Sequence, residues 1–124
     1  MKLASIMPAA ACDLIESDYH FCFAELALRY PAYAAYYKEQ RGTVIMDTMV
    51  FERKRVIPIQ EWLTAIDLVQ PTLAISPDVL ENAEATKANY RFYSQFTGTK
   101  LMPVVQGKDF EEFVKCFEYF LDRS

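Results

Sequence analysis

The polar residues of this chain that could do chemistry gather where short apolar runs end. Asp47 directly follows one run, Asp78 lies three residues beyond a second, and Gln106 and Gly107 follow a third. Carboxylates accept hydrogen bonds from N–H and NH2 groups, and a glutamine amide both donates and accepts them. Together they suit a planar heterocycle such as a purine. Taken singly, Asp78 is also explained as a helix cap and Gly107 as a turn residue. The prediction therefore rests on the occurrence of such residues after three successive apolar runs.

Four apolar runs are the predicted strands that would position these groups. They occupy residues 3–7, 43–46, 72–75 and 101–105. None of them alternates with polar residues, which is typical of strands buried on both faces of a parallel sheet. Pro103 lies inside the last run, and because proline cannot donate to a ladder, it indicates an edge position or a bulge.

Helical patterns fill the connections between the runs. Asp109 and Glu112 form a capping-box-like start to the final helix, whose apolar stripe is rich in phenylalanine. Proline at a first helical position and glycine after a last one define other ends. The predicted helices cover residues 13–41 (two helices separated at Pro31), 58–70, about 79–96, and 109–121.

This alternation indicates an α/β fold with parallel strands, in a single βαβαβαβα domain over residues 1–124. The length fits one domain, and 52% hydrophobic residues argue against disorder. Two architectures fit: four consecutive units of a (β/α) barrel, which is half of a TIM-type barrel, or an open doubly wound sheet. Both place functional residues at the carboxyl ends of strands.

Three segments resemble motifs of the tRNA-guanine transglycosylase superfamily. Asp-Thr-Met-Val-Phe-Glu at 47–52 is similar to the family's Asp-Ser-Gly-Gly-Phe-Gln. It is closer to the Asp-Asn-Gly-Ala-Phe-Glu of bacterial and phage relatives that insert 7-deazaguanine bases into DNA. Ser-Pro-Asp-Val-Leu at 76–80 resembles a Pro-Asp-Val-Leu segment of those relatives, and Met-Pro-Val-Val-Gln-Gly at 102–107 resembles the family's Val-Gln-Gly strand. The order and spacing agree over 43–124, so the likeness is to the N-terminal half alone.

The resemblance implies a barrel that exchanges a guanine-type base at a nucleoside through a covalent glycosyl-enzyme intermediate. It implies that Asp78, Gln106 and Gly107 hold the base, with Asp47 beneath it in a binding or proton-transfer role. A carboxylate that faces a base N–H stays ionised through that hydrogen bond, and fixed donors and acceptors discriminate among bases. Met49 stands where the family has glycine, so we expect it to narrow the base site.

The resemblance also sets expectations for cofactors and partners. The family's nucleophilic aspartate and zinc ligands lie later than Ser124, so we expect a base-recognition half without metal or other cofactor. The three cysteines Cys12, Cys22 and Cys116 contain no C-x2–4-C pair and indicate neither a zinc site nor a disulfide framework. Four units leave the inner side of the sheet uncovered. We therefore expect a homodimer or a second half-barrel chain.

The charge balance limits contacts with nucleic acid to a local patch. The net charge of −4 provides no overall basic field, whereas Arg53, Lys54 and Arg55 form a basic run that could contact phosphates of DNA or tRNA. The sequence has no apolar stretch long enough to span a membrane, and we expect a cytoplasmic protein. An alternative function is a catalytically inactive remnant or small binding module, because the family's glycines and nucleophile are missing.

Overall fold

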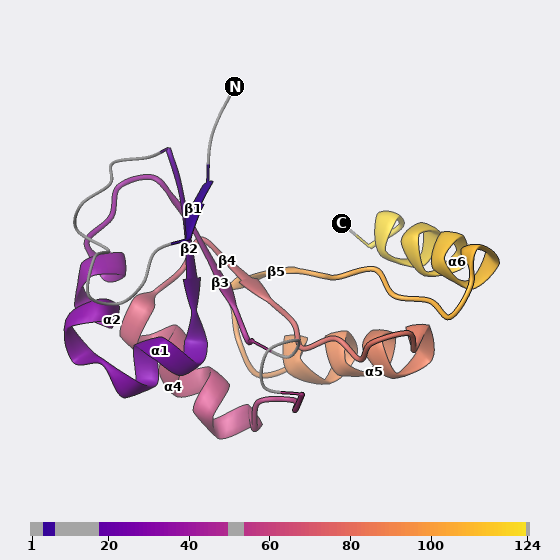
Figure 1. The fold of residues 1–124 in the computed structure, drawn as a ribbon, viewed down its shortest axis with the longest axis horizontal. Helices are drawn as coiled ribbons and strands as arrows, with labels where there is room; N and C mark the ends of the chain where they lie inside the picture. The colour runs from indigo at the N-terminus through magenta and orange to yellow at the C-terminus, as the bar shows by residue number, and fades with distance from the viewer. Residues whose placement is uncertain (1–3, 7–17, 50–53, 124) are drawn as a thin grey trace.

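The computed structural model describes residues 4–6, 18–49 and 54–123, which contain one five-stranded parallel sheet (Figure 1). The strands are β1 (Ala4–Ile6), β2 (Tyr19–Phe23), β3 (Thr43–Asp47), β4 (Leu73–Ile75) and β5 (Lys100–Met102). All neighbouring pairs are parallel, so the predicted α/β fold with parallel strands is confirmed. β5 lies at one edge and ends just before Pro103, which agrees with the edge position that this proline indicates.

The strand order in space is the order in the chain, β1-β2-β3-β4-β5. A doubly wound sheet instead reverses its order at a switch point, and the described strands contain no such reversal. The open doubly wound sheet therefore does not fit this part of the chain. Right-handed crossovers that all step in one direction place their helices on one face. Figure 1 shows α1 (Ala24–Arg29), α2 (Pro31–Lys38) and α4 (Ile59–Val69) grouped together beside the sheet.

Strand β2 was not among the predicted strands, because residues 13–41 read as two helices. Tyr19–Phe23 instead pairs with β1 and β3. His20 and Cys22 are buried, and the three aromatic residues that alternate with them are half-buried. Aromatic side chains fit such a pleated surface well. The two predicted helices do follow β2, and Pro31 begins the second one as predicted. The predicted pattern of four strands therefore lacked one strand, β2.

The remaining helices start and end close to the predicted places. α5 (Ala83–Ser94) is shorter than predicted, because Asn82 caps it through a hydrogen bond from the Ala85 backbone N–H. α6 (Phe110–Leu121) has Asp109 as its N-cap, as predicted, with a bond from the Glu112 N–H. The Glu112 carboxylate does not complete a capping box but accepts from the Ala83 N–H, 3.1 Å away. It thereby ties the starts of α5 and α6 together.

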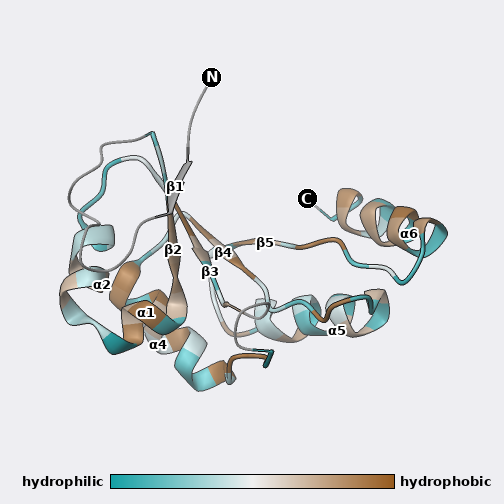
Figure 2. Cartoon of the chain, in the orientation of Figure 1, coloured by the Kyte–Doolittle hydropathy of each residue, from teal (hydrophilic) through white to brown (hydrophobic). Residues whose placement is uncertain are grey.

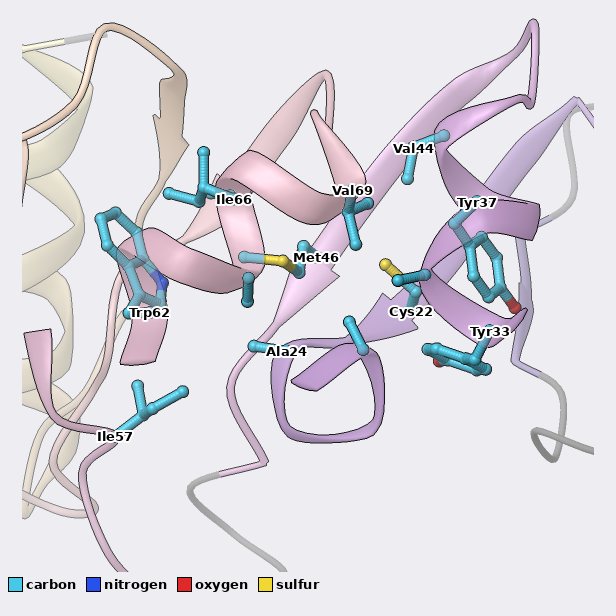
Figure 3. Close-up of a cluster of buried hydrophobic side chains, with 14 of the residues drawn as sticks. Cys22, Ala24, Tyr33, Tyr37, Val44, Met46, Ile57, Trp62, Ile66 and Val69 are labelled. Carbon is cyan, nitrogen blue, oxygen red and sulfur yellow. The ribbon is translucent and has the colours of Figure 1, made fainter. Parts of the chain in front are cut away.

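The main core lies between the sheet and helices α1, α2 and α4 (Figure 3). Its largest members include Trp62 of α4, Tyr33 of α2 and Met46 of β3, and all three are at most 1% exposed. Cys22 of β2 lies in the same core, where burial and the nearby charge of Asp47 raise the pKa of its thiol to about 12. Burial of each large apolar side chain contributes about 1.5–3 kcal/mol, so this cluster is a main source of stability.

The C-terminal region has a second, smaller core, in which Ala83 of α5 packs with Cys116 and Phe120 of α6. The other phenylalanines of α6 are exposed, up to 82% for Phe110. Figure 1 shows α6 beyond the edge of the sheet, and Figure 2 shows that one side of this helix is hydrophobic. Only Phe120 among the four phenylalanines of the predicted stripe is buried. This helix therefore carries an apolar surface that the described residues leave uncovered.

Candidate functional site

The four predicted site residues follow three neighbouring strands of the sheet. Asp47 is the last residue of β3, and Asp78 lies in the loop after β4. Gln106 and Gly107 lie in the connection between β5 and α6. Because the three strands are parallel neighbours, their carboxyl ends meet at the same edge, as the sequence predicted.

Asp78 and Gln106 form a hydrogen-bonded pair at this edge. The Gln106 Nε2 donates to Asp78 Oδ2 at 2.6 Å, and Gln106 Oε1 accepts from the Glu81 backbone N–H at 3.0 Å. Both ends of the amide are thus fixed, which sets its orientation. Asp78 is only 8% exposed, and its second oxygen, Oδ1, has no hydrogen-bond partner among the described residues. A carboxylate oxygen in this state is an acceptor that a ligand N–H group could satisfy.

The loop that holds Asp78 is fixed independently of this carboxylate. The Thr86 hydroxyl accepts from the Val79 N–H at 2.9 Å and lies 3.2 Å from the Val79 carbonyl oxygen. Asn82, not Asp78, caps α5. The simpler explanation of Asp78 as a helix cap therefore fails, and the position of its side chain needs another explanation.

Asp47 is half-buried and points to the other side of β3 from Met46, because side chains alternate along a strand. Its Oδ1 accepts from the Thr48 backbone N–H at 2.7 Å. It lies one strand away from Asp78 and does not line the cleft described below. The structure therefore brings Asp78 and Gln106 into contact, while Asp47 stays a neighbour on the same edge.

A cleft of about 240 Å³ opens beside Asp78. One wall comes from the segment that precedes α4, and the other from the loop after β4. Its lining residues are Lys54, Arg55, Val56, Asp78, Val79 and Leu80. Arg55 forms ion pairs with Glu25 at 2.9 Å and with Glu61 at 3.8 Å. Two of the three residues of the predicted basic run thus share a cleft with Asp78, and Arg53 lies outside the described residues.

Gly107 has a packing role that the sequence did not reveal. A Cβ atom at this position would collide with the backbone of Phe113 in the first turn of α6. Only glycine lets the chain pass this close to the helix. Gln106 is the preceding residue, so a shift of the chain at Gly107 would also move the Gln106 amide that contacts Asp78.

Strained backbone surrounds the site. Four described non-glycine residues have a positive φ, and three of them are Met49, Lys54 and Glu81, at 61°, 56° and 56°. They lie in the segments after β3 and after β4. Left-handed backbone costs a non-glycine residue about 1–2 kcal/mol, and such strain clusters at functional sites. Met49, which the predicted resemblance aligns with a glycine, thus has the conformation that glycine favours.

Two buried hydroxyl groups near the site were not predicted. Thr48 directly follows β3 and Ser76 directly follows β4, which are neighbouring parallel strands. Their Oγ atoms are buried, and neither has a hydrogen-bond partner among the described residues. Only their positions directly after two apolar runs could have drawn attention to them. Such buried groups are usually satisfied by internal water.

Comparisons with models of known protein families, with curated proteins and with solved structures gave no match. The resemblance to transglycosylases therefore stays a prediction. Within the described ranges, no group of three or more histidine, cysteine or acidic side chains could hold a metal ion. None of the helices in these ranges is long and apolar enough to cross a membrane.

Proposed function

We propose that this chain is the base-recognition part of a transglycosylase-like protein that modifies guanine or 7-deazaguanine bases in DNA or tRNA. The observation that carries the proposal is the hydrogen bond between Asp78 and Gln106 at the carboxyl ends of neighbouring strands. It supports the sequence prediction that these two residues act together. The family relationship itself rests on the sequence motifs.

The chemistry of the pair suits a guanine-type base. The N–H and NH2 groups on one edge of guanine are donors, and Asp78 Oδ1 is an acceptor whose place is fixed by the Gln106 amide. Hydrogen bonds to a charged acceptor in a buried place are worth more than neutral ones. A base without donors on this edge would leave the carboxylate unpaired and be rejected.

The sequential parallel sheet supports an incomplete (β/α) barrel as the architecture of this protein. The strand side chains that point away from the helices are half-buried, and they include Phe21, Phe23 and Ile45. Eight-stranded closure would need three strands beyond the five described ones. Two copies would bring ten strands, which is more than an eight-stranded barrel holds. The five strands therefore favour completion by a different segment or chain over the homodimer that four units suggested.

Calorimetric titration with guanine and with 7-cyano-7-deazaguanine tests the proposal. Both bases should bind the wild-type chain, and Asp78→Asn should weaken binding by about 10–100-fold, because it removes a charged acceptor. The fold should persist, since the asparagine oxygen can still accept from Gln106. Circular dichroism spectra and unfolding midpoints would check this.

Asp67→Asn is the matched control. It makes the same chemical change at a residue on the exposed side of α4. It should leave base binding unchanged. A folded wild-type chain that binds neither base would contradict the proposal. Equal binding by wild type and Asp78→Asn would contradict the role given to Asp78.

A small binding module without catalytic activity is the second candidate function. The exposed apolar side of α6 favours it, with Phe110, Phe117 and Leu121 at 82%, 49% and 58% exposure. Exposed apolar patches of this kind mark interaction surfaces. This candidate predicts that no labelled base is exchanged into DNA or tRNA, even after the completing half of a barrel is supplied. Reproducible exchange would rule it out.

A further inference from the structure

Three cationic side chains meet at one aromatic ring where α5 packs against α6 (Figure 1). The ring is that of Tyr119. Its centroid lies 5.1 Å from Lys87 Nζ, 5.9 Å from Arg91 Cζ and 3.5 Å from Arg123 Cζ, and each contact is a cation–π interaction. We call these four residues the Tyr119 cluster. None of them lines the cleft beside Asp78, so the cluster is a separate feature of the molecule.

Hydrogen bonds fix the orientation of both guanidinium groups of the cluster. Arg91 Nη1 donates to the Tyr119 hydroxyl at 2.9 Å, and Arg123 Nη1 donates to the Tyr119 carbonyl oxygen at 3.0 Å. A guanidinium group has five N–H donors, and the other donors of these two side chains have no partner among the described residues. Both arginines are exposed. The cluster therefore presents oriented, charged donors to a ligand in the solvent.

The charge of the cluster is only partly balanced. Lys87 forms an ion pair with Glu84 at 2.9 Å, whereas no carboxylate within the described ranges pairs with Arg91 or Arg123. The hydrogen bond and the charge of Lys87, with a smaller contribution from Arg91, hold the pKa of the Glu84 carboxyl below its usual value. Three positive charges thus accompany one negative charge. The cluster has two positive charges in excess, in a chain whose net charge is −4.

This concentration of like charge is unfavourable for the chain alone. Lys87 and Arg91 are four residues apart on α5, where like charges face and repel each other. Arg123 brings a third positive charge to the same ring. A bound anion would offset this repulsion and would accept hydrogen bonds from the unpaired donors of both arginines.

We propose that the Tyr119 cluster binds a phosphate monoester, the class of anion whose charge and geometry match it. A phosphate monoester has a charge of about −1.5 to −2 at pH 7 and three acceptor oxygens. Its charge balances the excess of the cluster, and the planar forks of Arg91 and Arg123 suit bidentate contacts with its oxygens. A carboxylate or a phosphodiester has a single charge and would leave one positive charge unbalanced. The inference does not depend on base recognition at Asp78.

Titrations with three small anions, followed by the amide NMR signals of the chain, test the ligand class. Methyl phosphate, dimethyl phosphate and acetate differ in charge and in their acceptor oxygens. At low salt and about pH 7.5, above the second phosphate pKa of about 6, methyl phosphate should bind about tenfold more tightly than the other two. The signals of residues 87–91 and 119–123 should shift, and those of the loop that holds Asp78 should not.

Arg91→Gln and Arg123→Gln each remove one guanidinium group from the exposed surface. Each should weaken the binding of methyl phosphate by about tenfold. Tyr119→Phe keeps the ring but removes the hydroxyl that orients Arg91, so we expect a smaller loss. Arg29→Gln is the matched control, because Arg29 of α1 also lies over a tyrosine ring, 5.5 Å from the centroid of Tyr30. It removes the same charge outside the cluster and should leave binding unchanged.

The phosphate group could belong to a small molecule or to the 5′ end of a nucleic-acid strand, since both present the same chemistry. A short single-stranded DNA, with and without a 5′-phosphate, separates these sources. If the phosphorylated strand binds more tightly than both methyl phosphate and the unphosphorylated strand, the ligand is a strand end. If it binds no more tightly than methyl phosphate, the ligand is a small molecule.

The outcomes that overturn the inference are distinct from those that concern the proposed function. The inference fails if methyl phosphate causes no shifts, if it binds no more tightly than acetate, or if Arg91→Gln and Arg123→Gln leave its binding unchanged. Unfolding midpoints check that these variants fold. Asp78→Asn does not alter the cluster and should leave methyl phosphate binding unchanged, so a failure of base recognition would not remove this site.

Discussion

The two ends of the sheet are built differently. Around β2, β3 and β4, three helices cover one face and enclose a core that contains Trp62, Tyr33 and Met46. Beyond β5, α6 packs against α5 through a core with only three fully buried members, and its exposed side chains include Phe110 and Phe117. The first region can hold its shape by its own packing, whereas the second depends on few contacts.

The candidate site lies across the boundary between these regions. Asp78 follows β4, whose Ala74 belongs to the main core, and Gln106 follows the edge strand β5. The hydrogen bond from Gln106 to Asp78 therefore joins the loop that follows a strand of the main core to the connection that leads into α6. We infer that base affinity depends on how well the C-terminal region is held, in addition to the chemistry of the pair.

The largest effect is expected from the main core. Trp62→Ala removes a fully buried indole and should lower the free energy of unfolding by about 3–5 kcal/mol, enough to unfold many domains of this size. Phe110→Ala removes an aromatic ring that is 82% exposed and should change stability by less than about 0.5 kcal/mol. Urea unfolding followed by circular dichroism measures both. Similar losses for the two variants would show that α6 is packed against something in solution.

A smaller effect is expected at the boundary. Gly107→Ala places a Cβ atom against the Phe113 backbone, so the start of α6 must shift, at a cost of about 1–3 kcal/mol. Hydrogen exchange should show faster exchange in α6, with α4 unchanged, and base affinity should fall because Gln106 moves. Gly98→Ala is the control, since a Cβ atom there meets nothing within 4 Å. Loss of protection throughout the sheet would refute the division into two regions.

The sequence predicted the elements whose signals are local. Asp109 at the start of α6 and Pro31 at the start of α2 appeared where expected, because caps and helix-starting prolines depend on a few neighbouring residues. β2 was missed because Tyr19–Phe23 was interpreted together with the long helical connection around it. Its pairing with β1 and β3 is a long-range event that a short window of sequence does not contain.

The candidate site was predictable in position but not in its contacts. Parallel strands place their carboxyl ends together, so the proximity of Asp78 and Gln106 followed from the strand prediction. The packing of the loops decides which residue caps α5 and which residue lies against Gly107. The sequence does not state how the loops pack. The sequence likewise does not state that Arg55 forms ion pairs with Glu25 and Glu61.

The smallest expected effect concerns the backbone next to Asp47. Met49 has a φ of 61°, so Met49→Gly should relieve left-handed strain of about 1–2 kcal/mol and lose about 0.5–1 kcal/mol to the greater freedom of the unfolded chain. We expect a net gain in unfolding free energy of about 0.5–1 kcal/mol. Met102→Gly is the control in β5, where glycine has no such strain to relieve and should destabilise the chain.

The same variant tests whether the side chain of Met49 narrows the base site. If it does, Met49→Gly should bind 7-cyano-7-deazaguanine more tightly than the wild-type chain, while Asp78→Asn in the same background should still weaken binding. A gain in stability without a gain in affinity would mean that the glycine of the family motif serves the backbone alone. A loss of stability would mean that the half-buried Met49 side chain contributes more packing than its backbone conformation costs.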